Sequence, residues 1–564
     1  MKELVFKILR KALQDLKVKI PDEKLESLIE LPPSQDMGDY ALPCFSLSPI
    51  MKLDAHEIAL QVREKIGNIE ETDFSSIDVT GPYVNFFLNR KSLARQTVWD
   101  IINKKASYGS SGLGKKKKVV FEFSSPNVAK PFGIGHLRST IIGNSLASIF
   151  EFESAKVTRL NYLGDWGTQF GRLLFGFKKF GNEKLLEKDP LKQLYSIYVK
   201  TSKKMYDEKA REWFRKMEAG DKSSLLLWKV FRDVSIAKLK KVYKQLGITF
   251  DSYEGESDYN KKAKLVLQQL DKKKLLKKSS GALVVDLEKL GLGVALMEKS
   301  DGATLYATRD LAAAIARYDK YKFDFMFYEV GQEQKLYFEQ LFKILGLMGY
   351  QWSKDCFHIS HGLYLDSKGK KFSTRKGKTV FLEDILEKTK TLAAKEIKKR
   401  TKKISKADLE ERSLRVAIAA IFYGDLKNNR RNDVVFDLKR FVSFEGDTGP
   451  YLLYSYARAS SILRKSKPQM RKFEVPELHD KELSLAKKLS QFPDAVANAY
   501  RSLNPAAIAN YSSELAQSFN EFYHACPVLG SEEKETFRLA LVESFRQVMK
   551  NALTLLGITT VEEM

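Results

Sequence analysis

The chain has 564 residues, of which 43% are hydrophobic, and this length predicts about three or four domains with buried cores. Its net charge of +25 indicates a polyanionic partner, with nucleic acid the first candidate and a membrane surface the second. No apolar run is long enough to span a bilayer. Cys44, Cys356 and Cys526 are isolated, which argues against a disulfide framework or a structural zinc site and favours a reducing, cytoplasmic compartment.

Residues 1–110 predict a separate α/β module. The segment at residues 79–88 is rich in the residues that favour a strand. If they are exposed, Tyr83 and Asn85 could stack on and hydrogen-bond to unpaired bases; the alternative is that the aromatic residues of this segment are simply core. Apolar residues at helical spacing predict two helices before it, near residues 4–16 and 55–66.

A glycine-, serine- and lysine-rich segment at residues 104–118 nearly spells a P-loop. It lacks the serine or threonine after the lysine, and a strand follows where a P-loop requires a helix. We therefore predict a flexible basic linker.

The next segment predicts a nucleotide site. Residues 116–123 predict a strand that is buried on both faces. A loop with two prolines follows, and apolar residues at helical spacing begin at Ile134. The start of a helix after such a loop presents backbone N–H groups and a positive dipole end to phosphate. Gly135 lets the backbone approach a flat ligand, and His136 supplies a donor that can be neutral or charged near pH 7.

These residues resemble the nucleotide-binding signature of class I aminoacyl-tRNA synthetases, and residues 123–132 resemble its arginyl version. There is one departure, because the signature usually reads His-x-Gly-His and its first position here is Gly133. The alternative is a plain turn between a strand and a helix, which is common in α/β proteins.

A second predicted strand, at residues 156–163, ends in a polar and glycine-rich string at residues 161–171. Asp165 and Trp166 then lie at the carboxyl end of a strand, where open α/β sheets bind ligands. The string closely resembles arginyl-tRNA synthetases; the alternative is a structural turn with Trp166 in the core. Residues 172–290 predict charged helices and resemble the connective insertion of class I enzymes.

The second half of the sheet is predicted to begin near residues 281–285. Helical spacing then places Tyr306 and Asp310 on one face of a helix, and a carboxylate beside an aromatic ring suits a guanidinium group. Glu122 could supply a second carboxylate, because a buried glutamate needs a cationic partner and free arginine would be one. The alternative is that Asp310 caps a helix or pairs with Arg309.

The resemblance also implies how the rest of the amino acid is held. Asn127 and Gln334, the latter after a predicted strand at residues 325–330, would bind its α-amino and carboxylate groups. Ser125 would belong to the same subsite.

A charged loop at residues 368–378 follows a predicted strand at residues 358–365. Cations on such a loop can neutralise the charge that develops as pyrophosphate leaves. The loop resembles the second class I signature in degenerate form, with Thr374 in place of the second lysine; the alternative is a localisation-type basic run. The resemblance assigns ATP binding to six residues: Gly133, Gly135, His136, Lys371, Phe372 and Ser373. It assigns catalysis to three: His136, Lys371 and Arg375.

Residues 386–564 predict helices almost throughout and resemble the helical anticodon-binding domain of the family. Tyr451 and Tyr454 are the predicted nucleotide contacts there, provided that they are exposed. The predicted domains are an N-terminal additional tRNA-binding domain at 1–110, a catalytic domain at 116–385, a stem-contact region at 386–445 and an anticodon-binding domain at 446–564.

The predicted fold is therefore α/β: a class I Rossmann-type parallel sheet, an N-terminal α/β domain and a C-terminal all-α domain. The resemblance implies arginine–tRNA ligation through arginyl-adenylate, with ATP and Mg²⁺ and without a dedicated metal site, in a monomer that binds arginine-accepting tRNA and no membrane. Two alternatives stay open, namely an inactive tRNA-binding paralogue, motivated by Gly133, and a nucleotidylyltransferase with a different acceptor.

Overall fold

The computed structural model describes residues 2–30, 32–34, 37–67, 73–128, 132–299, 306–366, 368–370, 381–400, 403–466 and 473–564. The chain forms two compact units. The first unit comprises Met1–Tyr108, Arg458–Pro493 and Glu514–Met549, and the second comprises Gly109–Ala457, Asp494–Ser513 and Lys550–Met564. Within the described ranges, no helix has both the length and the apolar character that a membrane crossing needs.

A five-stranded parallel sheet forms the centre of the second unit, with the strand order β11-β10-β4-β5-β6. The chain builds β4, β5 and β6 outward on one side and then crosses to add β10 and β11 on the other. The order therefore reverses between β4 and β10, and open sheets bind ligands at the carboxyl ends of the strands beside such a point. The strands are β4 (Lys118–Glu122), β5 (Lys156–Leu163), β6 (Ser252–Gly255), β10 (Phe325–Gly331) and β11 (Cys356–His361).

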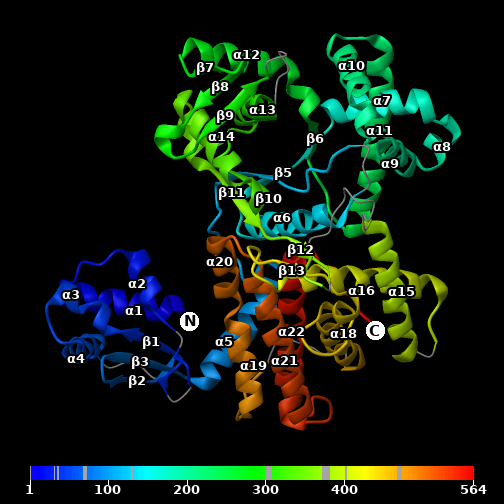
Figure 1. The fold of residues 1–564 in the computed structure, drawn as a ribbon. Helices are drawn as coiled ribbons and strands as arrows, with labels where there is room; N and C mark the ends of the chain where they lie inside the picture. The colour runs from blue at the N-terminus through cyan, green and yellow to red at the C-terminus, as the bar shows by residue number, and fades with distance from the viewer. Residues whose placement is uncertain are drawn as a thin grey trace. The chain divides into compact units, whose positions relative to one another are not determined.

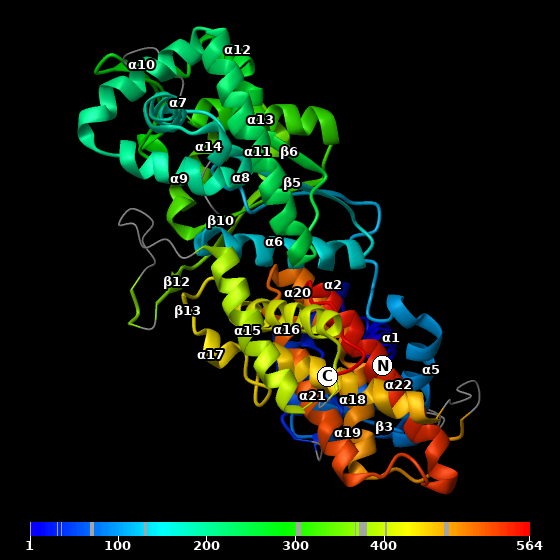
Figure 2. The same ribbon diagram turned by 90° about the vertical axis from the view of Figure 1, so that its right-hand side faces the viewer.

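Helices cover both faces of this sheet, which agrees with the predicted Rossmann-type α/β fold. Helix α6 (Ile134–Phe152) covers one face, where the ring of Phe150 lies 5.2 Å from that of Phe121. Helices α13 (Tyr306–Tyr321) and α14 (Lys335–Leu347) pack on the other face, in a core that includes Val120 and Leu160. Figures 1 and 2 both show α13 and α14 on one side of β5 and β10, and α6 on the opposite side.

The prediction that residues 281–285 begin the second half of the sheet is wrong. Strand β8 (Ala282–Asp286) lies between β7 (Leu276–Ser279) and β9 (Val294–Glu298) in a separate antiparallel sheet. Ser280 and Gly281 both have positive φ and join β7 to β8 as a two-residue hairpin turn. The range predicted as a helical insertion also contains β6, a strand of the main sheet. The helices of this range are α7 (Thr168–Phe180), α8 (Glu183–Lys188), α9 (Pro190–Thr201), α10 (Asp207–Glu218), α11 (Lys222–Leu246) and α12 (Asn260–Lys272).

The segment predicted as a flexible linker is held in place on its second-unit side. The Glu153 carboxylate accepts hydrogen bonds from the backbone N–H groups of Ser111 and Leu113, at 3.0 and 3.1 Å. A Cβ atom added at Gly114 would lie 2.8 Å from the Cβ atom of Ala155. The prediction of flexibility is therefore wrong here, because contacts with a distant residue fix a segment whose composition alone favours disorder.

The predicted strand at residues 358–365 is interrupted at Gly362, where a Cβ atom would lie 2.5 Å from the carbonyl oxygen of Asn432. Its second part, β12 (Tyr364–Leu365), pairs in parallel with β13 (Val434–Val435). The helices that follow residue 380 confirm the predicted helical region: α15 (Leu382–Arg400), α16 (Lys406–Leu426), α17 (Leu438–Phe441), α18 (Gly449–Ser466), α19 (Asp480–Ser490), α20 (Phe492–Ser502), α21 (Ala506–Ala525) and α22 (Glu535–Leu555).

The first unit contains an antiparallel sheet of order β1-β3-β2. The predicted strand at residues 79–88 is in fact two strands joined by a turn in which Gly81 has a φ of +56°. The strands are β1 (Tyr40–Pro43), β2 (Phe74–Thr80) and β3 (Tyr83–Leu88), and the helices are α1 (Lys2–Asp15), α2 (Asp22–Leu28), α3 (Ser48–Met51), α4 (Ala55–Ile66) and α5 (Arg90–Lys104).

Candidate active site

The loop between β4 and α6 turns sharply at the carboxyl edge of the sheet. Ser124 and Ser125 both have positive φ, 71° and 42°, which non-glycine residues rarely adopt and which clusters at functional sites. Ser139 of α6 fixes the turn, because its Oγ atom accepts a hydrogen bond of 2.9 Å from the N–H of Ser124. This hydrogen bond holds the turn at Ser124 against the helix.

The start of α6 has the form that the sequence predicts for a phosphate site. Gly133 caps the helix, and a Cβ atom added at the exposed Gly135 would meet nothing within 4 Å. His136 is half-buried in the first turn. The N-terminal end of a helix and the open space above glycine can accept a nucleotide phosphate and an adjacent flat base.

The residues that follow the charged loop lie beside the start of this helix. Phe381 pairs with Gly133, and the N–H of Leu382 donates to the carbonyl of Phe132 at 3.0 Å. The end of the loop range therefore meets the start of α6. The predicted ATP and catalytic residues of the loop lie outside the described residues: Lys371, Phe372, Ser373 and Arg375.

Asn127 joins two motifs that are separate in the sequence. Its backbone pairs with Gly164, and its Oδ1 atom accepts a hydrogen bond of 3.3 Å from Gln169. A Cβ atom at Gly164 would lie 2.5 Å from the same Oδ1 atom, so only glycine leaves room for this amide. The Oγ atom of the neighbouring Ser125 is buried and has no hydrogen-bond partner among the described residues. Two polar groups are thus available at the predicted α-amino and carboxylate subsite.

Glu122 already has a cationic partner within the chain. Its carboxylate accepts a hydrogen bond from Arg317 of α13, and both side chains are almost completely buried. The guanidinium of Arg317 also lies 4.6 Å from the ring centroid of Tyr162, and its Nε atom lies 3.6 Å from Glu254. Burial raises the pKa of Glu122, and the charge of Arg317 opposes that shift. A direct contact between Glu122 and free arginine stays a prediction.

Asp310 differs from Glu122 because it is reachable and makes no ion pair within the part of the chain that the structure describes. Its side chain accepts a hydrogen bond from the hydroxyl of Tyr337, and the residue is partly exposed. Burial of the carboxyl group raises the pKa of Asp310, while Tyr337 and Arg317 oppose the shift. Arg309 forms its ion pair with Glu256, at 3.2 Å, so the alternative in which Asp310 pairs with Arg309 is wrong, although the charge of Arg309 still lowers the pKa of Asp310.

Several carboxyl groups lie close enough to Asp310 to interact with it electrostatically. Burial raises the pKa of Glu256 to about 8; the charges of Asp310 and Asp165 add to the shift and that of Arg309 opposes it. Tyr306 is 53% exposed, and the guanidinium of Arg309 lies 5.4 Å from its ring centroid. Such an excess of carboxylates favours a cation as the missing partner.

Asp165 and Trp166 support the site without facing it. The Asp165 carboxylate binds Arg232 at 2.7 Å and accepts hydrogen bonds from the N–H and Oγ of Ser257, at 2.8 and 2.7 Å. Trp166 is buried against Trp228, with ring centroids 5.4 Å apart. The reading of this string as a structural turn is therefore confirmed for these two residues, whereas Gly164 and Gln169 contact Asn127.

The remaining predicted residues are placed as follows. Gln334 is exposed in a short 3₁₀ turn directly after β10. Tyr83 is half-buried, but Asn85 is only 5% exposed, so the exposure that a base contact requires is missing at Asn85. Tyr451 and Tyr454 are half-buried on α18. Their roles, and those of Gln334 and Tyr83, stay predictions.

Sequence reasoning missed Arg317, Tyr337 and Glu256. Arg317 lies two helical turns after Asp310, and this spacing places both residues on one face of α13, which is a signal that the sequence contains. No comparable local signal connects Asp310 with Tyr337 or Glu256, since these residues come from different elements of the fold.

Comparisons with known proteins cover the whole chain. A family model described as "tRNA synthetases class I (R), catalytic domain" matches residues 97–438, "DALR anticodon binding domain" matches 452–564 and "Arginyl tRNA synthetase N terminal domain" matches 3–88. The chain is 43% identical to an arginine–tRNA ligase of Clostridium acetobutylicum over 96% of this chain and 97% of the relative. It is 42% identical to an arginine–tRNA ligase of Halothermothrix orenii over 100% of this chain and 99% of the relative.

The fold has a counterpart among solved structures. The arginyl-tRNA synthetase of Thermus thermophilus superposes with a TM-score of 0.83 at 24% identity and covers 100% of both chains. The shared fold, the three matched domains and the full-length relatives agree with the motifs at the sheet edge. This chain therefore belongs to the arginyl-tRNA synthetase family of class I aminoacyl-tRNA synthetases.

Proposed function

We propose that this chain is an arginine–tRNA ligase that activates arginine with ATP and transfers it to the 3′ end of its tRNA. In the first step the carboxylate of arginine attacks the α-phosphorus of ATP, forming arginyl-adenylate and releasing pyrophosphate. The terminal ribose of the tRNA then displaces AMP. Neither step needs a covalent side-chain nucleophile. The protein therefore acts by positioning the reactants and by stabilising the charge that develops.

Asp310 is the single observation that carries the assignment of the amino acid. It is a reachable carboxylate at the carboxyl edge of the sheet, its protein partner is a hydroxyl, and its neighbours are already paired with Arg317 and Arg309. A guanidinium group fits because its N–H donors can pair with the carboxylate and its flat face can contact Tyr306. Asn127, Ser125 and Gln334 then bind the α-amino and carboxylate groups of the substrate.

ATP is proposed to lie over the start of α6, with its phosphates near the backbone of Gly133 and Ile134 and its base over Gly135. His136 donates to the phosphates, and Lys371 and Arg375 neutralise the charge on departing pyrophosphate. Mg²⁺ accompanies ATP on its phosphate oxygens rather than occupying a protein cage.

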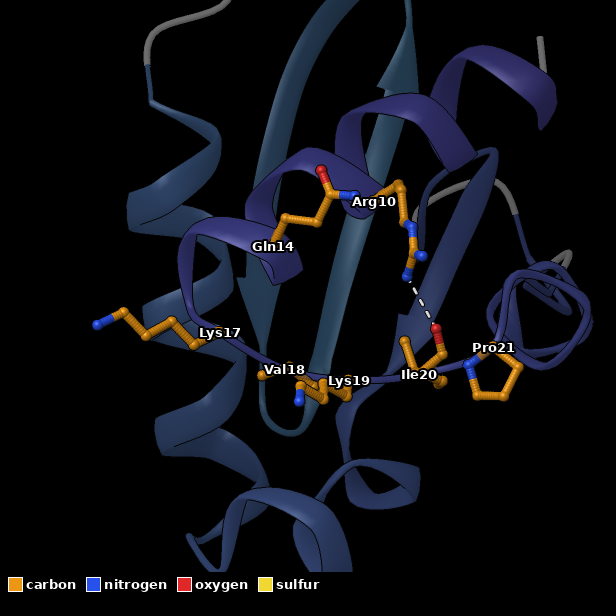
Figure 3. A pocket seen from close by; sticks show the side chains of 7 residues that line it. All are labelled: Arg10, Gln14, Lys17, Val18, Lys19, Ile20 and Pro21. Atoms are coloured by element: carbon orange, nitrogen blue, oxygen red, sulfur yellow. Dashed lines mark hydrogen bonds between the residues drawn. The ribbon is translucent and has the colours of Figure 1, made fainter.

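The tRNA is proposed to contact both the N-terminal module and the C-terminal helices. A pocket on the N-terminal module is lined by α1 and the segment after it, and its lining includes Arg10 and the exposed Lys17 and Lys19 (Figure 3). Arg10 donates to the carbonyl of Ile20 at 2.8 Å and pairs with Asp22. The exposed lysines can contact a phosphate backbone.

The protein acts as a monomer in the reducing cytoplasm.

ATP–pyrophosphate exchange with each of the twenty amino acids, with and without tRNA, tests this function. We expect exchange with arginine only, and only when tRNA is present. Exchange with another small acceptor would favour the nucleotidylyltransferase, and tRNA binding without exchange would favour an inactive paralogue, which the glycine at position 133 motivates.

A further inference from the structure

The chain's own Arg317 occupies the kind of environment that recognises a guanidinium. It pairs with the Glu122 carboxylate, lies 4.6 Å over the ring of Tyr162 and has a second carboxylate, Glu254, at 3.6 Å. A carboxylate pair and an aromatic face are the groups from which a guanidinium site is built. Arg317 is 2% exposed, so this environment is closed to a ligand while the arginine is present.

The second guanidinium environment, around Asp310, is open. Asp310 is partly exposed and Tyr306 is 53% exposed, whereas Glu122 is 5% exposed behind Arg317. Asp310 and Arg317 are two helical turns apart on α13, and the charge of Asp310 also raises the pKa of both Glu122 and Tyr162. One helix, α13, carries Asp310 and Arg317 on the same face and so links the open site to the filled one.

We infer that Arg317 is a positioning residue for substrate selection: it fills the inner carboxylate site around Glu122 and so directs the substrate side chain to the open site at Asp310. This inference rests on the proposed function. A buried glutamate without its arginine would be an uncompensated negative charge that attracts any cation. With Arg317 in place, the open site offers the Asp310 carboxylate and nearby hydroxyl groups. A planar guanidinium can pair with these groups together, whereas the point charge of a lysine ammonium leaves some of them unpaired, so lysine is rejected. Arg317 also fixes the Glu122 carboxylate and the Tyr162 ring that border the open site.

Replacement of the side chain by a small one tests the inference through chemical rescue. Arg317→Ala should raise the KM for arginine about 10- to 100-fold, as a displaced pocket wall does, with little change in the KM for ATP. Rejection of lysine should weaken, because Glu122 is then unpaired. Guanidinium chloride at low millimolar concentration should restore both properties by filling the vacated site, whereas ammonium should not, because it lacks the planar fork.

Arg538→Ala is the matched control. Arg538 is also a buried arginine in an ion pair, with Glu482 at 2.6 Å, but it lies in the first unit. Both variants should lower the thermal unfolding temperature, since each leaves a buried carboxylate unpaired. Only Arg317→Ala should shift the arginine KM and respond to guanidinium, which separates positioning from general stability.

The outcomes are distinct. A folded Arg317→Ala protein with the wild-type arginine KM and wild-type rejection of lysine overturns the inference, as does a raised KM that guanidinium leaves unchanged. If Arg317→Ala does not fold, Arg317→Lys decides: it keeps the charge and loses the fork, so a wild-type arginine KM in this variant also overturns the inference. Failure of the unsubstituted protein to exchange with arginine and tRNA would instead refute the proposed function.

Discussion

Asp310→Asn is the sharpest test of where the substrate guanidinium binds. The substitution preserves the shape of the side chain and still allows the hydroxyl of Tyr337 to donate a hydrogen bond to an oxygen. It removes the negative charge from a partly exposed carboxylate that makes no ion pair among the described residues. Removal of one partner from a desolvated charge pair costs about 2–5 kcal/mol. The amide keeps one acceptor, so we expect the lower part of this range, about 2–3 kcal/mol, or roughly a 30- to 150-fold rise in the arginine KM.

The same substitution should not destabilise the protein without substrate. Burial raises the pKa of Asp310, so its ionised form is disfavoured in the folded chain relative to the unfolded chain. Stability from a group with a raised folded pKa is present at low pH and is lost as the pH rises through that pKa. At pH 8 the neutral amide avoids this loss, and we expect an unchanged or higher unfolding temperature.

The assay is ATP–pyrophosphate exchange at saturating ATP and tRNA, with arginine and lysine titrated separately, together with thermal unfolding at pH 8. Asp165→Asn is the contrasting variant, because an NH₂ group there would face donors from Arg232 or Ser257. It should lower the unfolding temperature and change the arginine KM far less. A folded Asp310→Asn protein with the wild-type arginine KM would show that the guanidinium binds elsewhere.

Four further predictions follow from the same contacts. The pKa of Glu256 is about 8 in the folded chain and ordinarily 4.5, so the stability that its protonated form contributes is lost as the pH rises from 4.5 through 8. Glu256→Gln should therefore flatten the fall in unfolding temperature between pH 4.5 and pH 8, and an unchanged pH profile contradicts this. Gly164→Ala should raise the arginine KM by displacing Asn127, while Gly346→Ala, whose added Cβ atom would lie 3.3 Å from a serine hydroxyl, should not; equal effects would argue against the Asn127 subsite. His136→Ala should slow arginine activation by about 10²–10³, as for loss of one preorganised donor, and near-normal exchange would place His136 outside the site. Log affinity for tRNA should fall steeply with log salt because of the +25 net charge, and a slope near zero would refute the electrostatic account.

Local patterns in the sequence predicted the elements that depend on nearby residues. The alternation between β4, the glycine-containing loop and α6 is visible because burial on both faces, turn chemistry and helical periodicity are all properties of adjacent residues. Helix α4 begins and ends where its pattern does, at Ala55 and Ile66, because Asp54 caps its start and Gly67 follows its end. Tyr306 and Asp310 were paired correctly on one helix for the same reason.

Other predictions failed where local preference competes with long-range contact. Residues 281–285 have the composition of a buried strand, but composition does not specify a partner strand, and the Ser280–Gly281 turn gives them an antiparallel one. Asn85 has a polar side chain, yet β3 is the central strand of its sheet and buries it. The linker was predicted to be flexible because the acceptor that orders it, Glu153, comes from a distant part of the sequence.

By itself the sequence determined the family motifs, their order and the residue types that arginine and ATP require. Only the tertiary structure decided which partners the two predicted carboxylates have within the protein. The sequence offered Asp310 and, as a second carboxylate, Glu122; folding brings Arg317 against Glu122 and leaves Asp310 with a hydroxyl partner. The physical reason is that the affinity of a carboxylate for a ligand depends on its burial and on the charges around it. Those neighbours come from β4, α13 and α14, which are separated along the chain and meet only at the edge of the sheet.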